Sequence, residues 1–202
     1  MTAVTQPETR RGRPPAASRD DVLEAASYRY LRGHRIDVQA IAAELGLGRT
    51  TIYRWFGSRD GLIGEVLVLA VDPLIDEARA GARGRGAALL LDTFDRINRA
   101  LVAAPALRQF LEQERDVALR VMTSADGIVQ PHVVARIAGL IDDEVGRGGF
   151  EPPVDPETLA YAIVRLAEAF LYEAQAGIRG DVDRLREVEA AMLGVRTSPG
   201  AS

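Results

Sequence analysis

Residues 46–62 read GLGRTTIYRWFGSRDGL, and this stretch decides the fold. Within it, Ile52 and Phe56 are spaced to lie on one face of a helix and to belong to a core. The other positions of that helix carry cationic, hydroxyl and aromatic side chains, namely Arg49, Thr50, Thr51, Tyr53, Arg54 and Trp55. A helix with one apolar face and a second face of this composition is expected to meet a partner outside the chain.

The preceding residues supply a second helix that packs against the first. Asp37 is placed to cap a helix that runs to about Leu45, and Gly46 can adopt the positive φ that ends it. Ala42 is small enough to let the two helices cross closely. The shared core is completed by Ile41, Leu45, Leu47, Ile52 and Phe56. This spacing predicts a helix-turn-helix motif.

A helix-turn-helix places its second helix in the major groove of double-stranded DNA. The N-terminal end of that helix reaches base edges, so Arg49 and Thr50 are predicted to set the sequence preference. The hydroxyl, guanidinium and indole groups that follow suit the DNA phosphates. Backbone contacts are therefore predicted for Thr51, Tyr53, Arg54, Trp55 and Arg59.

The same run resembles the recognition region of the TetR family of transcriptional regulators, whose pattern is roughly G-V-S-R-x-T-L-Y-x-H-F-x-S-K-E-x-L. The matching positions are Gly46, Leu47, Gly48, Arg49, Thr51, Ile52, Tyr53, Phe56, Ser58, Arg59, Asp60 and Leu62. The family usually has Ser, His and Lys where this chain has Gly48, Trp55 and Arg59. The resemblance covers about residues 19–64. It implies a DNA-binding domain over residues 18–64 and a helical ligand-binding and dimerisation domain over residues 65–195.

The composition narrows the class of protein. With 202 residues, of which 47% are hydrophobic, the chain can bury a sizeable core. It has no Cys, and its two His residues, His34 and His132, lie far apart, so we expect neither disulfides nor a metal site. No apolar run approaches the length of a membrane span. We therefore expect a cytoplasmic protein with no membrane contact, no catalytic residues and no cofactor.

Charge is divided unevenly along the chain, whose net charge is −4. Residues 1–64 hold ten Arg against seven acidic residues, a net of +3, which leaves −7 for residues 65–202. A basic end on an acidic body favours an anion-binding module carried by a second domain.

The two ends of the chain lack apolar periodicity, and we predict a disordered basic arm over residues 1–17 and a disordered tail over residues 196–202. The stretch RRGRPP at residues 10–15 resembles the core of an AT-hook over four residues. Arg11 and Arg13 are therefore candidates for contacts in an A·T-rich minor groove. A tail that only improves solubility is an equally weighted interpretation.

Helical periodicity runs through the rest of the chain and predicts an all-α fold. Before the motif it predicts a helix from Asp20 to Leu31. After it, Ser58 is placed to cap a helix from about Arg59 to Ala82, past Pro73. Five more helices are expected, over about residues 86–104, 105–121, 128–145, 155–176 and 181–193.

The helix over residues 155–176 is apolar around most of its girth and needs partners on more than one side. In the family, the corresponding helix and the last one form a four-helix dimer interface, which implies a homodimer here. The interface candidates are Ile163, Phe170, Leu171 and Leu185. A central helix of a monomer is the alternative.

Large side chains on facing helices predict a mostly apolar pocket for an unknown small-molecule effector. The candidates are Phe94, Ile97, Leu107, Phe110, Met122, Tyr161, Arg165 and Glu168. The last three belong to a polar line that includes Tyr172, which could orient a polar head group or could face solvent. The acidic runs around Glu114 and Glu144 are interpreted as solvated faces.

Together these patterns predict a ligand-responsive, sequence-specific DNA-binding regulator. We interpret it as a repressor released from an inverted-repeat operator by a small, largely apolar molecule. Two alternatives come from other classes: an all-α enzyme with an incidental helix-turn-helix, and an architectural DNA-binding protein that ignores ligands.

Overall fold

The computed structural model describes residues 17–175 and 181–195 of the chain. The predicted tail and the predicted basic arm with Arg11 and Arg13, except for Ala17, lie outside these residues. Within the described ranges the regular structure is helical throughout, which confirms the all-α class. The N-terminal helices are α1 (Arg19–Leu31), α2 (Val38–Glu44), α3 (Arg49–Phe56) and α4 (Arg59–Gly81). The body adds α5 (Ala87–Ala103), α6 (Pro105–Gln113), α7 (Arg115–Thr123), α8 (Val129–Gly146), α9 (Pro156–Gln175) and α10 (Val182–Met192).

Side-chain caps mark the starts of α2 and α4 as predicted. The Asp37 carboxylate accepts hydrogen bonds from the backbone of Gln39 and Ala40 at the start of α2. Ser58 accepts one from Gly61 at the start of α4. These caps satisfy amide groups that have no partner within their own helix.

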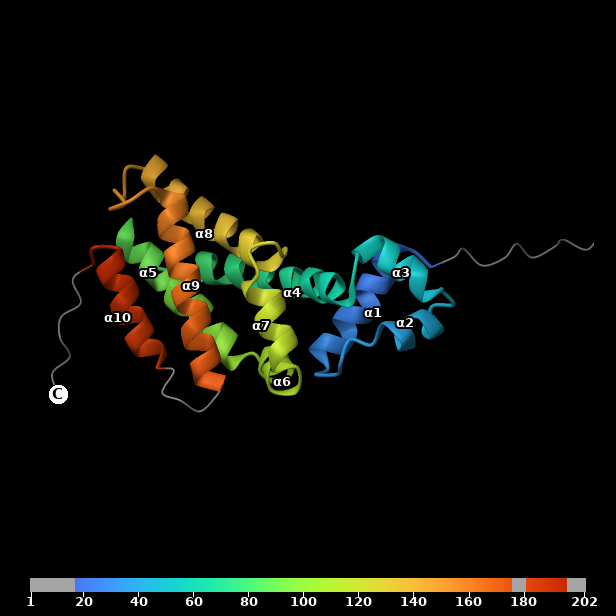
Figure 1. Ribbon diagram of the computed structural model, residues 1–202. Helices are drawn as coiled ribbons and strands as arrows, with labels where there is room; N and C mark the ends of the chain where they lie inside the picture. The colour runs from blue at the N-terminus through green and yellow to red at the C-terminus, as the bar shows by residue number, and fades with distance from the viewer. Residues whose placement is uncertain (1–16, 176–180, 196–202) are drawn as a thin grey trace, which may run out of the picture.

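The helices form a small N-terminal unit and a larger body (Figure 1). In that view α1, α2 and α3 lie at one end, and α4 runs from them into the body formed by α5 to α10. The predicted domain boundary near residue 64 falls inside α4, which continues past Pro73 without ending. One continuous helix therefore connects the two parts.

Two apolar cores hold the molecule together. The first combines α1, α2, α3 and the start of α4 with buried residues of α6 and α7, including Leu107, Phe110 and Ala118. The second lies in the body, between the far half of α4 and helices α5, α8, α9 and α10. Because the first core crosses from the N-terminal unit to α6 and α7, the body contacts that unit at a second place besides α4.

The sequence predicted a single helix from Pro105 to about Val121, and this was wrong. The chain forms α6 and α7, with a break at Glu114, where φ is −138° and ψ is 46°. The apolar residues of both helices fit one continuous helical period, so the pattern held no sign of the break. The cause lies in tertiary structure: Glu114 turns inward and is 6% exposed.

Both buried glutamates correct the prediction of solvated acidic faces. Glu112 and Asp116 are exposed, but Glu114 between them is buried. Asp142 and Asp143 are exposed, but Glu144 is buried and accepts hydrogen bonds from Arg79, Arg147 and the backbone of Gly86. Burial works to raise the pKa of Glu144, and these hydrogen bonds outweigh it and lower that pKa.

Gly86, at the start of α5, tests the close contact between this turn and the loop after α8. Its φ is +57°, and an added Cβ would lie 1.7 Å from the carbonyl oxygen of Gly149. We expect Gly86→Ala to lower the free energy of unfolding by ~2 kcal/mol or more, measured by urea titration. Gly139, inside α8, is the matched control because an added Cβ there meets nothing within 4 Å. Gly139→Ala should stabilise the protein by ~0.5–1 kcal/mol, and equal effects of the two substitutions would contradict this account.

Candidate nucleic-acid interface and ligand cavity

Helices α2 and α3 form the predicted helix-turn-helix. They are joined by residues 45–48, in which Gly46 has a φ of +65°. The backbone N–H of Leu47 donates to the carbonyl of Ala42 at 2.8 Å and closes the turn. Ile41 and Ile52 are almost fully buried between the two helices. The inner face of α3 is therefore committed to the core, and its orientation is fixed by packing.

The opposite face of α3 presents the predicted DNA-contacting side chains. Arg49, Thr50, Tyr53 and Arg54 are exposed. Thr51 and Trp55 are half-buried, and Trp55 packs against the first core, so less of each is available to a partner. Figure 1 shows α3 at the end of the molecule remote from α5 and α10.

The start of α3 is open to an anion. Its N-cap residue is Gly48, which has no side chain to accept a hydrogen bond from the first turn. Helix N-termini carry a partial positive charge and free N–H groups that bind phosphate. The absence of a side-chain cap, which the family usually supplies as Ser, therefore leaves room for a DNA phosphate.

Arg59 lies elsewhere than predicted. Its Nε donates to the carbonyl of Ile36 at 2.7 Å, and its Nη2 donates to Glu114 at 2.7 Å. The guanidinium thus bridges the N-terminal unit and the body, which corrects the expectation that it would face a DNA phosphate. The family pattern gave the position a basic residue, but only the buried acid at Glu114 determines where that residue points.

Glu114 is the centre of this junction. Its carboxylate pairs with Arg59 and, at 3.3 Å, with Arg35 of the α1–α2 loop. Burial works to raise the pKa of Glu114, but the hydrogen bonds from the two arginines outweigh it and lower that pKa. A third ion pair joins Arg120 of α7 to Asp60 of α4 at 2.7 Å. The α6–α7 break is therefore fastened by charge to the N-terminal unit.

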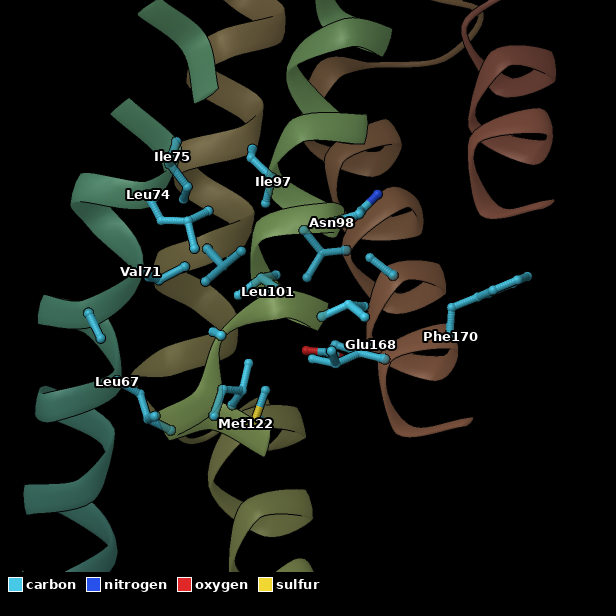
Figure 2. A pocket seen from close by; sticks show the side chains of 18 of the residues that line it. Leu67, Val71, Leu74, Ile75, Ile97, Asn98, Leu101, Met122, Glu168 and Phe170 are labelled. Atoms are coloured by element: carbon cyan, nitrogen blue, oxygen red, sulfur yellow. The ribbon is translucent and has the colours of Figure 1, made fainter. Parts of the chain in front are cut away.

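The body contains a cavity of about 350 Å³ (Figure 2). Its walls come from α1, α4, α5, α8, α9 and α10, together with Leu107 and Met122 from α6 and α7. Most lining side chains are aliphatic, including Leu67, Val71, Leu74, Ile75, Ile97 and Leu101. No Arg, Lys or His is among the described residues that line it. A volume of this size and polarity suits a small, largely apolar molecule.

The structure brings together five of the eight predicted ligand residues. Phe94, Ile97, Leu107, Met122 and Glu168 line the cavity.

The other three, Phe110, Tyr161 and Arg165, lie outside the cavity. Phe110 packs edge-on against Tyr30, with ring centroids 6.2 Å apart. Tyr161 is 50% exposed, and Arg165 is exposed and pairs with Glu168 at 2.7 Å. The predicted polar line lies along one side of α9, but its surroundings change along the helix. Tyr161 and Arg165 face solvent, Glu168 lines the cavity, and Tyr172 packs against the first core.

Besides many aliphatic lining residues, two buried polar residues of the cavity were not predicted from the sequence. Asn98 of α5 is 6% exposed and Glu189 of α10 is 0% exposed, and the Asn98 amide donates to Oε1 of Glu189 at 2.9 Å. Burial raises the pKa of Glu189 to about 7, although the hydrogen bond from Asn98 acts in the opposite direction. The sequence did indicate their burial, because each occupies a position on the apolar face of its helix. Asn98 comes four residues after Phe94, and Glu189 comes four residues after Leu185.

The predicted dimer residues face inward. Ile163, Leu171 and Leu185 are buried within the protomer at 3%, 6% and 2% exposure, and Ile163 lines the cavity. Phe170 is half-buried at the cavity, and its ring points away from the other labelled side chains in Figure 2. α9 is apolar on both sides, so the pattern alone could not distinguish its inner stripe from its outer one. Three of the four candidates are therefore corrected to core residues.

A helix-turn-helix unit joined to a helical body with an apolar cavity defines the class of one-component DNA-binding regulators. Sequence comparison agrees: the model of the tetracyclin repressor-like C-terminal domain matches residues 85–194, and that of the helix-turn-helix domain of resolvase matches residues 12–58. The chain belongs to the TetR family of transcriptional regulators. It is thus a DNA-binding regulator from a non-enzymatic family.

Solved structures give the same result. The transcriptional repressor QsdR of R. erythropolis, from the TetR family, superposes with a TM-score of 0.84 at 28% identity, over 91% of this chain and 97% of that one. The Thermus thermophilus repressor FadR, in complex with lauroyl-CoA, has a TM-score of 0.61 at 15% identity, over 92% and 100% of the two chains. AlkX of Dietzia sp. has a TM-score of 0.57 at 18% identity, over 88% and 97%. No curated protein sequence matches the chain.

No helix within residues 17–175 and 181–195 is long and apolar enough to cross a membrane. In those ranges no three His, Asp or Glu side chains are grouped to hold a metal ion.

The exposed face of α3 predicts two distinguishable mutants. Arg54→Ala should weaken binding to all DNA sequences and reduce the slope of log affinity against log salt by about one, as one phosphate contact is lost. Thr50→Ala should change which base pairs are preferred. Fluorescence anisotropy over a salt series measures both effects.

Arg108→Ala is the matched control, because Arg108 is an exposed arginine on α6 in the body. It should leave both the affinity and the salt slope unchanged. If Arg54→Ala behaved like Arg108→Ala, the assigned role of Arg54 would be wrong.

Proposed function

We propose that this regulator is a repressor that binds an inverted-repeat operator as a homodimer and is released by a small, largely apolar molecule. The observation that carries the proposal is the 350 Å³ cavity, whose wall includes Leu107 and Met122 of α6 and α7, the helices that also contact the DNA-binding unit. The similarity to the repressor QsdR over 91% of the chain supports repression. A regulator of this kind needs access to DNA, which implies the cytoplasmic location predicted from the sequence.

The cavity also supports a ligand-responsive regulator over an architectural protein that ignores ligands. An architectural protein that ignores ligands needs no internal space, and a cavity of 350 Å³ between packed helices costs stability unless a ligand fills it. The FadR complex holds lauroyl-CoA, which carries an acyl chain, so a protein of this fold can accept a long apolar group. Both points support an apolar effector here.

The dimer is proposed on the outer faces of α9 and α10. One recognition helix reads only a few base pairs, and two-fold pairing doubles the sequence that is read. With Ile163 and Leu185 buried inward, the apolar side chains left on the outer faces include Ala162, Leu166, Ala169, Phe170, Val188 and Ala191. Val188 is 43% exposed in the protomer, and pairing through this face would bury it.

Selection of bound duplexes from a random pool tests this assembly. We expect inverted repeats whose half-sites are separated by about one helical turn, ~34–36 Å, or a little more. Val188→Asp should separate the subunits in sedimentation equilibrium without unfolding them, and operator affinity should fall by at least ~100-fold, because each half-site then binds alone.

Val145→Asp is the matched control, since Val145 is a valine of similar exposure, 37%, that lies near the end of α8 and not on α9 or α10. It should remain dimeric. A monomeric wild type at micromolar concentration, or a Val188→Asp variant that stays dimeric, would overturn the proposed interface.

The route from ligand to DNA is proposed to run through Glu114. A ligand that contacts Leu107 and Met122 touches both helices that flank this residue. Glu114 in turn holds Arg59 at the start of α4 and Arg35 beside α2. A ligand can act on DNA only by preferring one arrangement of the two parts, and a preference of ~3 kcal/mol lowers operator affinity about a hundredfold.

This route is testable once a screen of small apolar compounds against the operator complex gives a releasing compound. Glu114→Gln keeps the shape of the side chain but removes the charge that binds both arginines. We expect the variant to bind the compound normally, while the compound's effect on operator affinity falls from ~100-fold to below ~10-fold. Glu112→Gln, on the exposed face of α6, should leave the effect intact. Full release from Glu114→Gln would exclude this route, and a screen without any releasing compound would count against the proposed function itself.

A further inference from the structure

We propose that Asn98 and Glu189 form the polar subsite of the cavity, and that this subsite selects ligands that donate one hydrogen bond from an otherwise apolar molecule. The inference rests on the proposed ligand-binding function of the cavity and names the class of ligand it takes.

The subsite has one unsatisfied acceptor. Oε1 of Glu189 accepts from the Asn98 amide at 2.9 Å, but Oε2 is buried and has no hydrogen-bond partner among the described residues. Glu189 is 0% exposed and belongs to the cavity lining. A buried carboxylate oxygen without a donor is costly, and buried polar groups in native proteins nearly always have a partner. Because Glu189 lines the cavity, a small shift of its carboxylate toward the cavity would let a ligand group supply that partner.

The electrostatics of the cavity exclude anionic head groups. Its acidic lining residues are Glu168 and Glu189, and no basic side chain of the described residues lines it. Arg165, which pairs with Glu168, is exposed and lies outside the lining. A carboxylate or phosphate in the cavity would therefore lose its hydration without gaining a cation. A positively charged donor would also lose hydration but would find a counter-charge at Glu189, and a neutral donor loses far less hydration.

The charged groups around Glu189 do not supply the hydrogen-bond donor that Oε2 lacks. Asp95 of α5 and Arg186 of α10 act on its charge with opposite signs, and they are 3.8 Å from each other. Across the cavity, Glu168 of α9 is engaged by Arg165. In the free protein, Glu189 can avoid the cost of a buried charge by taking up a proton, which agrees with a pKa raised to about 7. A ligand O–H or N–H that donates to Oε2 would lower the free-energy cost of burying the charged carboxylate in the same way.

Two isomeric probes test the donor requirement directly. The compounds n-nonanol and methyl octyl ether have the same atoms and each has an oxygen that accepts, but only the alcohol donates. By isothermal titration calorimetry we expect the protein to bind n-nonanol about tenfold more tightly, as one buried hydrogen bond to a charged acceptor implies. Nonanoate, an anion of similar length, should bind more weakly than either isomer.

Variants at Glu189 should remove this preference. In Glu189→Gln the amide oxygen can still accept from Asn98, so an N–H group replaces Oε2 at the cavity, and both isomers can accept from it. The two probes should then bind equally. Glu187→Gln is the matched control, because Glu187 is exposed on the same helix, and it should keep the tenfold preference. Should Glu189→Gln fail to fold, the same loss of preference is expected in the wild type as pH falls below the pKa of about 7.

The outcomes separate this inference from the proposed function. Equal binding of the isomers by the wild type, no binding of either, tighter binding of nonanoate, or an unchanged preference in Glu189→Gln would each overturn the subsite. Loss of preference in Glu189→Gln alone would establish it, even if no bound probe released the operator. In that case the cavity would select donors, and the proposed release mechanism would be what failed.

Discussion

The buried carboxylate of Glu114 is the constraint on which the arrangement of the two halves depends. A charge at 3% side-chain exposure requires partners, and Arg59 and Arg35 of the N-terminal unit supply them. To reach them, the chain leaves helical geometry at Glu114 and divides α6 from α7. Helices α6 and α7, which contribute Leu107 and Met122 to the cavity, are thereby joined through Glu114 to the N-terminal unit that carries the recognition helix α3.

These ion pairs fix the relative orientation of the two parts that share the first apolar core. Apolar contacts between α1, α6 and α7 hold the two parts together but tolerate sliding, because they are not directional. The ion pairs at Glu114 and between Arg120 and Asp60 fix which groups lie opposite each other. A small change in the angle of α6 or α7 therefore requires a change at the start of α4, where the N-terminal unit begins.

The cavity, unlike the junction at Glu114, is held by few directional interactions. Its walls are aliphatic over most of their area, which suits many apolar molecules about equally well. Selectivity in such a site depends on its few polar groups, because a buried group left without a partner costs more than a formed hydrogen bond contributes. Asn98 of α5 and Glu189 of α10 line the cavity and can exert this effect, and Figure 1 shows α10 at the end of the body remote from the DNA-binding unit.

The sequence by itself determined the elements that depend on local chemistry. The motif of Ala42, Gly46, Ile52 and Phe56 fixed the helix-turn-helix, and the caps Asp37 and Ser58 fixed where helices start, because such signals act within a few residues. Only tertiary structure decided which face of α9 is buried, why α6 ends at Glu114 and where Arg59 points. Each of these depends on a partner far away in the chain, such as the 55-residue separation of Arg59 and Glu114 or the 91-residue separation of Asn98 and Glu189. Helical periodicity reports that a side chain is apolar or polar, and it does not report which distant charge will meet it.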